Sequence, residues 1–125
     1  MPLGSISVFS AILLAQVTMA DIVFTLADQG SVRKTETGQS VLVQLPETPS
    51  TGYRWSLNAL PNEAIEIIES RWIAPARAGA GSSGTREFLL RVKAPGEIRL
   101  DFRLLRDWLG ESSTIERCEF TLRVS

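Results

Sequence analysis

Residues 97–104 read EIRLDFRL, and this stretch decides the fold class because apolar and charged side chains alternate in it without interruption. A period of two is typical of a β-strand with one buried face, whereas an amphipathic helix repeats its apolar positions every three or four residues. The apolar members would share one face of an extended chain: Ile98, Leu100, Phe102 and Leu104. The stretch therefore predicts a strand that lays one face on a hydrophobic core.

The same period recurs on both sides of this strand. Apolar residues alternate in the segments 22–26, 41–45, 53–57, 86–93 and 116–124, and a shorter strand is expected through Ile65, Ile67 or Ile68. The intervening stretches are rich in Gly, Pro, Ser and Thr, which is typical of turns. Seven or eight short strands without a convincing amphipathic helix predict an all-β fold, an antiparallel immunoglobulin-like β-sandwich.

Composition narrows the range of functions. The 125 residues are 44% hydrophobic with a net charge of −1, so residues 21–125 are expected to form one globular domain. Basic and acidic residues alternate along the chain, which leaves no basic stripe for a nucleic acid. The sequence has no histidine, the commonest general base near neutral pH. It therefore lacks the residue that activates the nucleophile in Ser-His and Cys-His catalytic sites. We therefore expect neither an enzyme nor a nucleic-acid partner.

Cys118 is the only cysteine, so an internal disulfide is impossible. It shares the strand parity of Phe120 and Leu122, which predicts a small buried side chain. The alternative, a reactive thiol, would require exposure and nearby cationic groups. The chain is accordingly expected to fold without a disulfide, a metal or a cofactor.

The N-terminal segment has a different character. Residues 6–17, ISVFSAILLAQV, are apolar and uncharged but too short to span a bilayer as one helix. The small residues before Asp21 then predict a secretory signal over residues 1–20 and a secreted or periplasmic mature protein, although the first basic residue is Arg33. The alternative is an N-terminal extension of a cytoplasmic protein. No later segment is apolar enough for a membrane span.

Three of the predicted loops are longer than a sandwich needs or carry a large aromatic residue. The first, TPSTG at residues 48–52, has five residues where two can close a hairpin, although Pro49 and Gly52 also suit a plain turn. The second, ARAGAGSSGT at 76–85, is too flexible and polar for a core. The third, RDWLGESST at 106–114, places a tryptophan beside a loop. In a sandwich with this strand order, the first and third loops can emerge at the same end.

In this order and at these separations, the segments LPETPSTGYRW, AGAGSSGTREF and LLRDWLG resemble the chagasin family of protein inhibitors of papain-like cysteine proteases. That family carries an Asn-Pro-Thr-Thr-Gly-aromatic loop, a Gly-x-Gly-Gly loop and an Arg-Pro-Trp loop on an immunoglobulin-like sandwich. The resemblance runs from about Gly30 to Val124. It covers almost all of the expected mature domain.

The first motif matches best, although Thr48 takes the place of Asn and Ser50 that of Thr. The glycines of the second loop are spread out, and Asp107 replaces the proline of the third, which loosens a fixed φ and adds a charge. The protease-binding residues that the resemblance implies are Thr48, Pro49, Ser50, Thr51, Gly52, Tyr53, Gly79, Gly81, Gly84, Arg106, Asp107 and Trp108.

The resemblance implies a reversible, non-covalent inhibitor, monomeric when free, whose three end loops enter the protease cleft with the Thr51 loop over the catalytic Cys–His pair. The alternative is an immunoglobulin-like adhesion or assembly module, which would use a sheet face or an edge strand. The charged alternation of the strand faces favours loops. For the tryptophans, Trp55 is expected in the core and Trp72 over a sandwich edge, whereas Trp108 is a loop contact unless a continued strand buries it.

Overall fold

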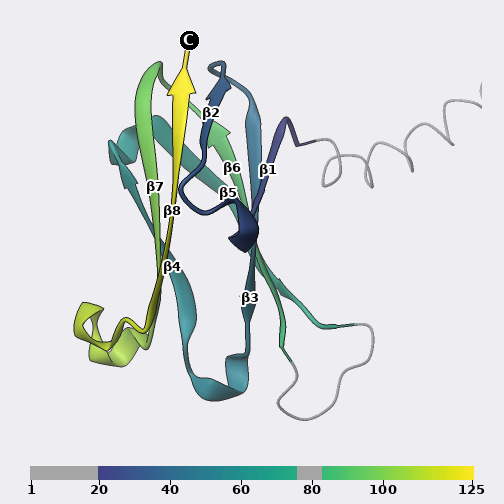
Figure 1. Cartoon of the computed structure of the whole chain (residues 1–125), viewed down its shortest axis with the longest axis vertical. Coiled ribbons are helices and arrows are strands. Elements are labelled where there is room, and N and C mark those ends of the chain that lie inside the picture. Colours follow the sequence, from purple (N-terminus) through teal and green to yellow (C-terminus); the bar gives the residue numbers. More distant parts are fainter. Residues whose placement is uncertain (1–19, 76–82) are drawn as a thin grey trace, which may run out of the picture.

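The computed structural model describes residues 20–75 and 83–125, and these residues form two facing four-stranded sheets (Figure 1). One sheet has the strand order β1-β3-β6-β5 and the other β2-β8-β7-β4. The strands are β1 Ile22–Thr25, β2 Val32–Thr35, β3 Ser40–Glu47, β4 Arg54–Leu60, β5 Ile65–Ile73, β6 Gly84–Val92, β7 Gly96–Leu105 and β8 Glu116–Val124. The all-β sandwich with eight strands is confirmed.

Both sheets are mixed, so the prediction of a purely antiparallel sandwich was wrong at one edge of each sheet. β1 pairs in parallel with β3, and β2 pairs in parallel with β8, while the other neighbours are antiparallel. The chain crosses from one sheet to the other between β1 and β2, through a short 3-10 turn at Leu26–Asp28. Alternation tells which side chains face the core, but it carries no information on the direction of the neighbouring strand.

The strand β2 was not predicted from the sequence. Its four residues, VRKT, contain one buried side chain, Thr35, because β2 is a short edge strand. β5 is longer than expected and has a register shift between Ile67 and Glu69. Ile67 is 51% exposed and only Ile65 of this strand joins the core.

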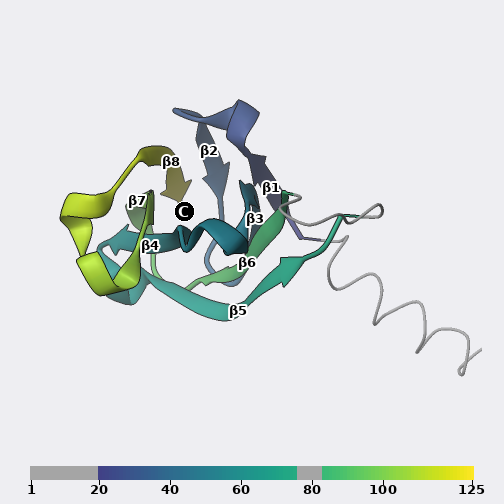
Figure 2. The same ribbon diagram turned by 90° about the horizontal axis from the view of Figure 1, so that it is seen from below.

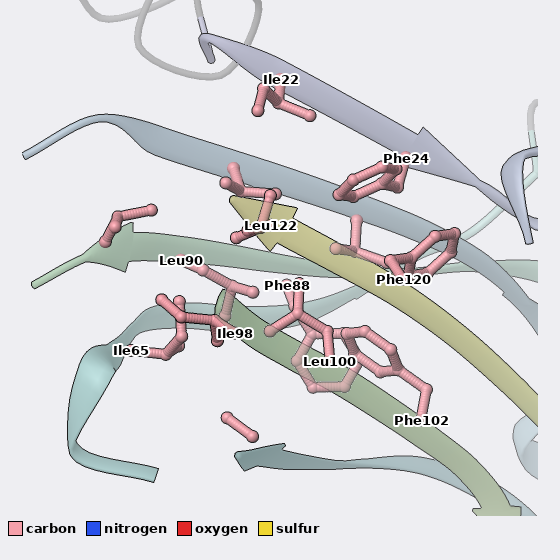
Figure 3. Close-up of a cluster of buried hydrophobic side chains, with 14 of the residues drawn as sticks. Ile22, Phe24, Ile65, Phe88, Leu90, Ile98, Leu100, Phe102, Phe120 and Leu122 are labelled. Atoms are coloured by element: carbon pink, nitrogen blue, oxygen red, sulfur yellow. The ribbon is translucent and has the colours of Figure 1, made fainter. Parts of the chain in front are cut away.

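The core lies between the sheets, and the predicted inward-facing side chains fill it (Figure 3). Phe24 of the first sheet stacks on Phe120 of the second at a ring distance of 4.4 Å, and Phe102 contacts Phe120 edge-on at 6.0 Å. Phe88 completes the row, 5.1 Å from Phe102. Offset and edge-to-face pairs of this kind add about 0.5–1.5 kcal/mol each to the burial of apolar area. Of the four residues predicted from EIRLDFRL, only Leu104 is partly exposed.

Cys118 in β8 is fully buried, as predicted for a small core side chain. Burial is the main cause that raises the pKa of its thiol from 9.0 to about 11, and the negative charges of Glu116 and Asp28 raise it further. Because this pKa is higher in the folded than in the unfolded chain, the stability that the neutral thiol contributes is complete below pH 9.0 and is lost as the pH rises toward about 11.

We expect Cys118 to resist a thiol-specific alkylating reagent in the native protein near neutral pH, since both burial and the raised pKa suppress the reactive thiolate. Mass spectrometry should show modification only after unfolding in guanidinium. Rapid alkylation of the native protein would contradict the burial of this side chain.

In the parts of the chain that the structure describes, no helix combines the length and apolar character needed to cross a bilayer. Residues 1–19 of the predicted signal segment lie outside the described residues.

Candidate functional site

The first loop, between β3 and β4, is a tight turn that closes on itself. Pro49–Thr51 form a 3-10 turn, and Gly52 ends it in the left-handed conformation with φ of 79°. The Gly52 amide donates to the Pro49 carbonyl at 2.9 Å. The Thr51 hydroxyl donates to the Thr48 carbonyl at 2.7 Å and accepts from the Tyr53 amide at 3.3 Å. The loop is therefore ordered by its own hydrogen bonds.

The third loop, between β7 and β8, consists of two short 3-10 turns, Asp107–Leu109 and Glu111–Ser113. The Ser113 hydroxyl accepts from the Arg106 amide at 2.9 Å and donates to the Gly110 carbonyl at 2.6 Å, which ties the two turns together. β7 ends at Leu105, so it does not continue far enough to bury Trp108. The Trp108 side chain is 68% exposed and confirms the prediction of a loop residue.

The first and third loops touch each other at one end of the sandwich, as predicted (Figure 1). The Arg106 Nη2 donates to the Thr51 carbonyl at 3.1 Å, and its guanidinium carbon lies 4.4 Å from the centre of the Tyr53 ring. The Trp108 indole lies over Gly52, where an added Cβ would be 2.6 Å from the Trp108 Cη2. Figure 2 looks onto this end from below, with the turn of the first loop near the middle and the turns of the third loop to its left.

The second loop leaves β5 after Ile73 and returns at Gly84 in β6. Gly79 and Gly81 lie outside the described residues. Gly84 is buried, and a Cβ there would collide with the Ile73 carbonyl and the Trp72 ring. Gly84 is thus required by the close approach of β5. It also pairs with Glu47, so the end of the second loop lies beside the start of the first.

Beneath the loops lies a buried carboxylate that sequence reasoning missed. Glu47 is 2% exposed; its Oε1 accepts from the Trp55 amide at 2.8 Å, and its Oε2 accepts from the Arg86 Nε at 3.0 Å and Nη2 at 2.8 Å. Its backbone carbonyl accepts from the Trp72 Nε1 at 3.0 Å. A signal existed, because Glu47 has the same strand parity as Val43 and Leu45.

The tryptophans below the loops take the positions expected of them. Trp55 is 4% exposed and belongs to the core, and its indole Nε1 donates to the Pro46 carbonyl at 2.8 Å. Trp72 lies on the edge strand β5, as predicted. Both indoles therefore fasten the end of β3, from which the first loop departs.

The outer sheet faces are only partly as expected. On the second sheet they carry charged pairs such as Arg103–Asp101 at 3.0 Å and Arg99–Glu119 at 3.9 Å. On the first sheet, however, the apolar residues Val23, Leu42 and Leu89 align across three strands. The expectation of uniformly charged faces was wrong there. Leu42 is only 4% exposed, so neighbouring side chains cover the middle of this row.

Within residues 20–75 and 83–125, no group of three His, Cys, Asp or Glu side chains is arranged to hold a metal ion. Among the large apolar side chains described, Trp108 is the most exposed, and Leu109 beside it is 52% exposed. The end of the sandwich thus presents ordered turns with a projecting indole. This arrangement suits recognition of another protein, since tryptophan is enriched at the centres of protein interfaces.

Comparison with known proteins agrees with this geometry. Residues 34–124 match the family model described as chagasin family peptidase inhibitor I42. Chagasin from Trypanosoma cruzi is 30% identical over 105 residues, covering 81% of this chain and 96% of chagasin.

Two solved structures share the fold. The cysteine protease inhibitor EhICP2 from Entamoeba histolytica has a TM-score of 0.75 at 18% identity, covering 83% of this chain and 96% of its own. PbICP-C, whose structure was determined in complex with falcipain-2, has a TM-score of 0.52 at 13% identity, covering 82% of this chain and 89% of its own.

Proposed function

Because the chain belongs to the chagasin family of peptidase inhibitors, we propose that it is a reversible, non-covalent protein inhibitor of papain-like cysteine proteases. The names of similar proteins support this class of target: EhICP2 is a cysteine protease inhibitor, and PbICP-C forms a complex with falcipain-2. The inhibitor itself does no chemistry, in keeping with a sequence that contains no histidine.

The observation that carries the proposal is the contact between two ordered loops at one end of the sandwich, through Arg106 and the Thr51 carbonyl. Ordered loops lose less conformational entropy when they enter a cleft than flexible loops do. In the proposed complex the Thr51 turn covers the catalytic Cys–His pair. The second and third loops flank it, and Trp108 packs against one wall of the cleft.

A loop that enters a protease cleft has to avoid being cleaved. Proteases hydrolyse extended backbone, whereas Pro49–Thr51 form a 3-10 turn and Gly52 is left-handed. The hydrogen bonds of Thr51 hold this turn closed. The turn therefore blocks the cleft without offering a peptide bond in a cleavable geometry.

Asp107 marks the departure from the family motif. Its side chain is exposed at the start of the Asp107–Leu109 turn, so the turn forms here without the proline of the family. An exposed carboxylate beside Trp108 adds a charge at the edge of the proposed contact. We propose that it alters affinity and the choice among target proteases.

Titration of papain with the purified protein tests the function directly. We expect loss of activity toward a small peptide substrate, saturating at one inhibitor per enzyme, with the inhibitor recovered uncleaved by mass spectrometry. Trypsin, a serine protease, should be unaffected. Full papain activity in excess inhibitor, or cleavage of the inhibitor at the Thr51 turn, would refute the proposal.

Trp108→Ala is expected to weaken papain inhibition by about 30-fold, or about 2 kcal/mol, as for an aromatic interface anchor. Since the side chain is 68% exposed, the free energy of unfolding should change by less than about 1 kcal/mol. The comparison is Val32→Ala, which truncates a 49% exposed apolar side chain on an edge strand away from the loops. Equal inhibition by Trp108→Ala and the parent would remove Trp108 from the contact.

We also propose that residues 1–20 direct export and are removed, so that the mature protein is secreted or periplasmic. The support is the uncharged apolar run at residues 6–17 followed by small residues. Mass spectrometry of protein from its native source should find Asp21 as the first residue. An intact Met1 in a cytoplasmic fraction would contradict export.

A further inference from the structure

We propose that Arg106 is a positioning residue, which joins the first and third loops into one rigid edge and acts through Tyr53 and Trp108 rather than by contacting the protease. The effect on inhibition rests on the proposed function. The junction itself is a property of the free protein.

The first support is the direction of the guanidinium. It points back onto the first loop, where Nη2 donates to the Thr51 carbonyl at 3.1 Å and the guanidinium lies 4.4 Å from the Tyr53 ring centre. The Trp108 ring centre is 5.9 Å from the same carbon. Arginine commonly stacks on aromatic rings in this way, and the attraction is strongest where water is excluded. The cation is thus already engaged by both loops.

The second support is the cost of this placement. The Arg106 Nε is buried and has no hydrogen-bond partner among the described residues. A buried donor without an acceptor is unfavourable. Hydrogen bonding alone therefore does not account for the position of the guanidinium. Its contact with the Tyr53 ring, the more distant Trp108 ring and the bond to the Thr51 carbonyl hold it there instead. With Nε buried, the guanidinium cannot offer its Nε–Nη2 edge to an external carboxylate in a bidentate pair.

The third support is the position of Arg106 at the root of the third loop. Its carbonyl accepts from the amides of Leu109 at 2.9 Å and Gly110 at 3.1 Å, and its own amide donates to the Ser113 hydroxyl at 2.9 Å. The backbone of Arg106 therefore organises the turn that carries Trp108. Its side chain at the same time fixes the Thr51 turn, so one residue sets the distance between the two loops.

The Trp108 indole makes a second contact between the third and first loops, independent of the Arg106 side chain. It lies so close over Gly52 that a Cβ there would come within 2.6 Å of the ring. The two contacts agree on one relative placement of the loops. The side chains of Tyr53 and Trp108 are therefore presented together, as parts of one surface.

The test is a double-mutant cycle on papain inhibition with Arg106→Met, which keeps the apolar stem, and Trp108→Ala. We expect Arg106→Met alone to weaken inhibition by about tenfold or more, and by a clearly smaller factor when Trp108 is already alanine, because one of the groups that it positions is gone while Tyr53 and the Thr51 turn remain. Arg99→Met is the matched control, since Arg99 lies on the outer sheet face with its side chain 59% exposed. Equal losses in both backgrounds would overturn the proposal.

Arg106→Lys separates positioning from charge. A lysine keeps the charge but cannot stack flat on Tyr53 while donating to the Thr51 carbonyl, so we expect it to inhibit no better than the methionine variant. Recovery of inhibition to within about twofold of the parent by lysine would indicate a direct charge contact with the protease and would overturn the proposal.

A readout without protease keeps the inference separate from the proposed function. If the parent fails to inhibit papain, that failure contradicts the function alone. The junction is then read from urea unfolding of Arg106→Met, Tyr53→Leu and the double variant. We expect the two changes to cost less together than the sum of the single losses, because they remove the same contact. Strict additivity would overturn the junction.

Discussion

Glu47→Ala is expected to lower the free energy of unfolding by about 3–5 kcal/mol, because it removes one partner of a buried ion pair. The Glu47 side chain is 0% exposed and receives two hydrogen bonds from Arg86, whose side chain is 13% exposed. Without the carboxylate, the half-buried Arg86 guanidinium has no counter-charge and the Trp55 amide loses its acceptor. Urea unfolding at neutral pH measures the loss.

The control is Glu97→Ala. Glu97 also pairs with an arginine, Arg123, but at 3.9 Å and with both side chains more than 60% exposed, so it should contribute less than about 1 kcal/mol. A second variant, Glu47→Gln with Arg86→Met, removes both charges yet keeps an acceptor for the Trp55 amide. It should recover a large part of the loss. A Glu47→Ala protein as stable as the Glu97→Ala protein would show that the buried pair is not needed.

The Glu47–Arg86 pair also fixes the strand ends from which the proposed binding loops depart. Glu47 is the last residue of β3, directly before the first loop, and its partner in the adjacent strand is Gly84, where the second loop ends. Trp55 and Trp72 donate from β4 and β5 to the carbonyls of Pro46 and Glu47. Four strands thus meet at the root of two of the proposed binding loops.

Side-chain alternation was sufficient to predict most strands and most of the core. Residues such as Phe88, Phe102 and Phe120 have parities that leave one choice of buried face, and all three are buried. The parallel edges were missed because parity is blind to strand direction. β2 was missed because VRKT places mainly polar groups on an edge strand, where little burial is required.

The sequence was sufficient to predict which loops form the site, but not the side-chain contacts that join them. The motifs pointed to Thr51 and Trp108, and the strand order brought their loops to one end. The stacking of Arg106 on Tyr53 depends on side-chain directions within irregular turns, which no periodic pattern describes. Glu47 had the parity of a core residue, but burial of its charge required a partner, Arg86, that lies 39 positions away.

Thr51→Glu is expected to weaken papain inhibition by more than about 100-fold, because the proposed complex places this side chain in a closed cleft where a new carboxylate would be buried without a partner. In the free protein Thr51 is exposed, and the backbone bonds from Thr51 to Thr48 and from Gly52 to Pro49 remain. The free energy of unfolding should therefore change by less than about 1 kcal/mol.

Thr51→Ser is the matched control, since serine keeps the hydroxyl that bonds the Thr48 carbonyl at 2.7 Å and should inhibit within about threefold of the parent. Papain titrations and thermal melts of the two variants show whether the Thr51 loop contacts the protease or only joins β3 to β4. If Thr51→Glu inhibited as well as the parent, the turn could not lie in the cleft, and the residues around Trp108 would have to account for binding without it. If instead Thr51→Glu lost inhibition and stability together while Thr51→Ser kept both, the loss would come from the missing hydroxyl that supports the turn, and the Thr51 side chain would not be placed in the cleft.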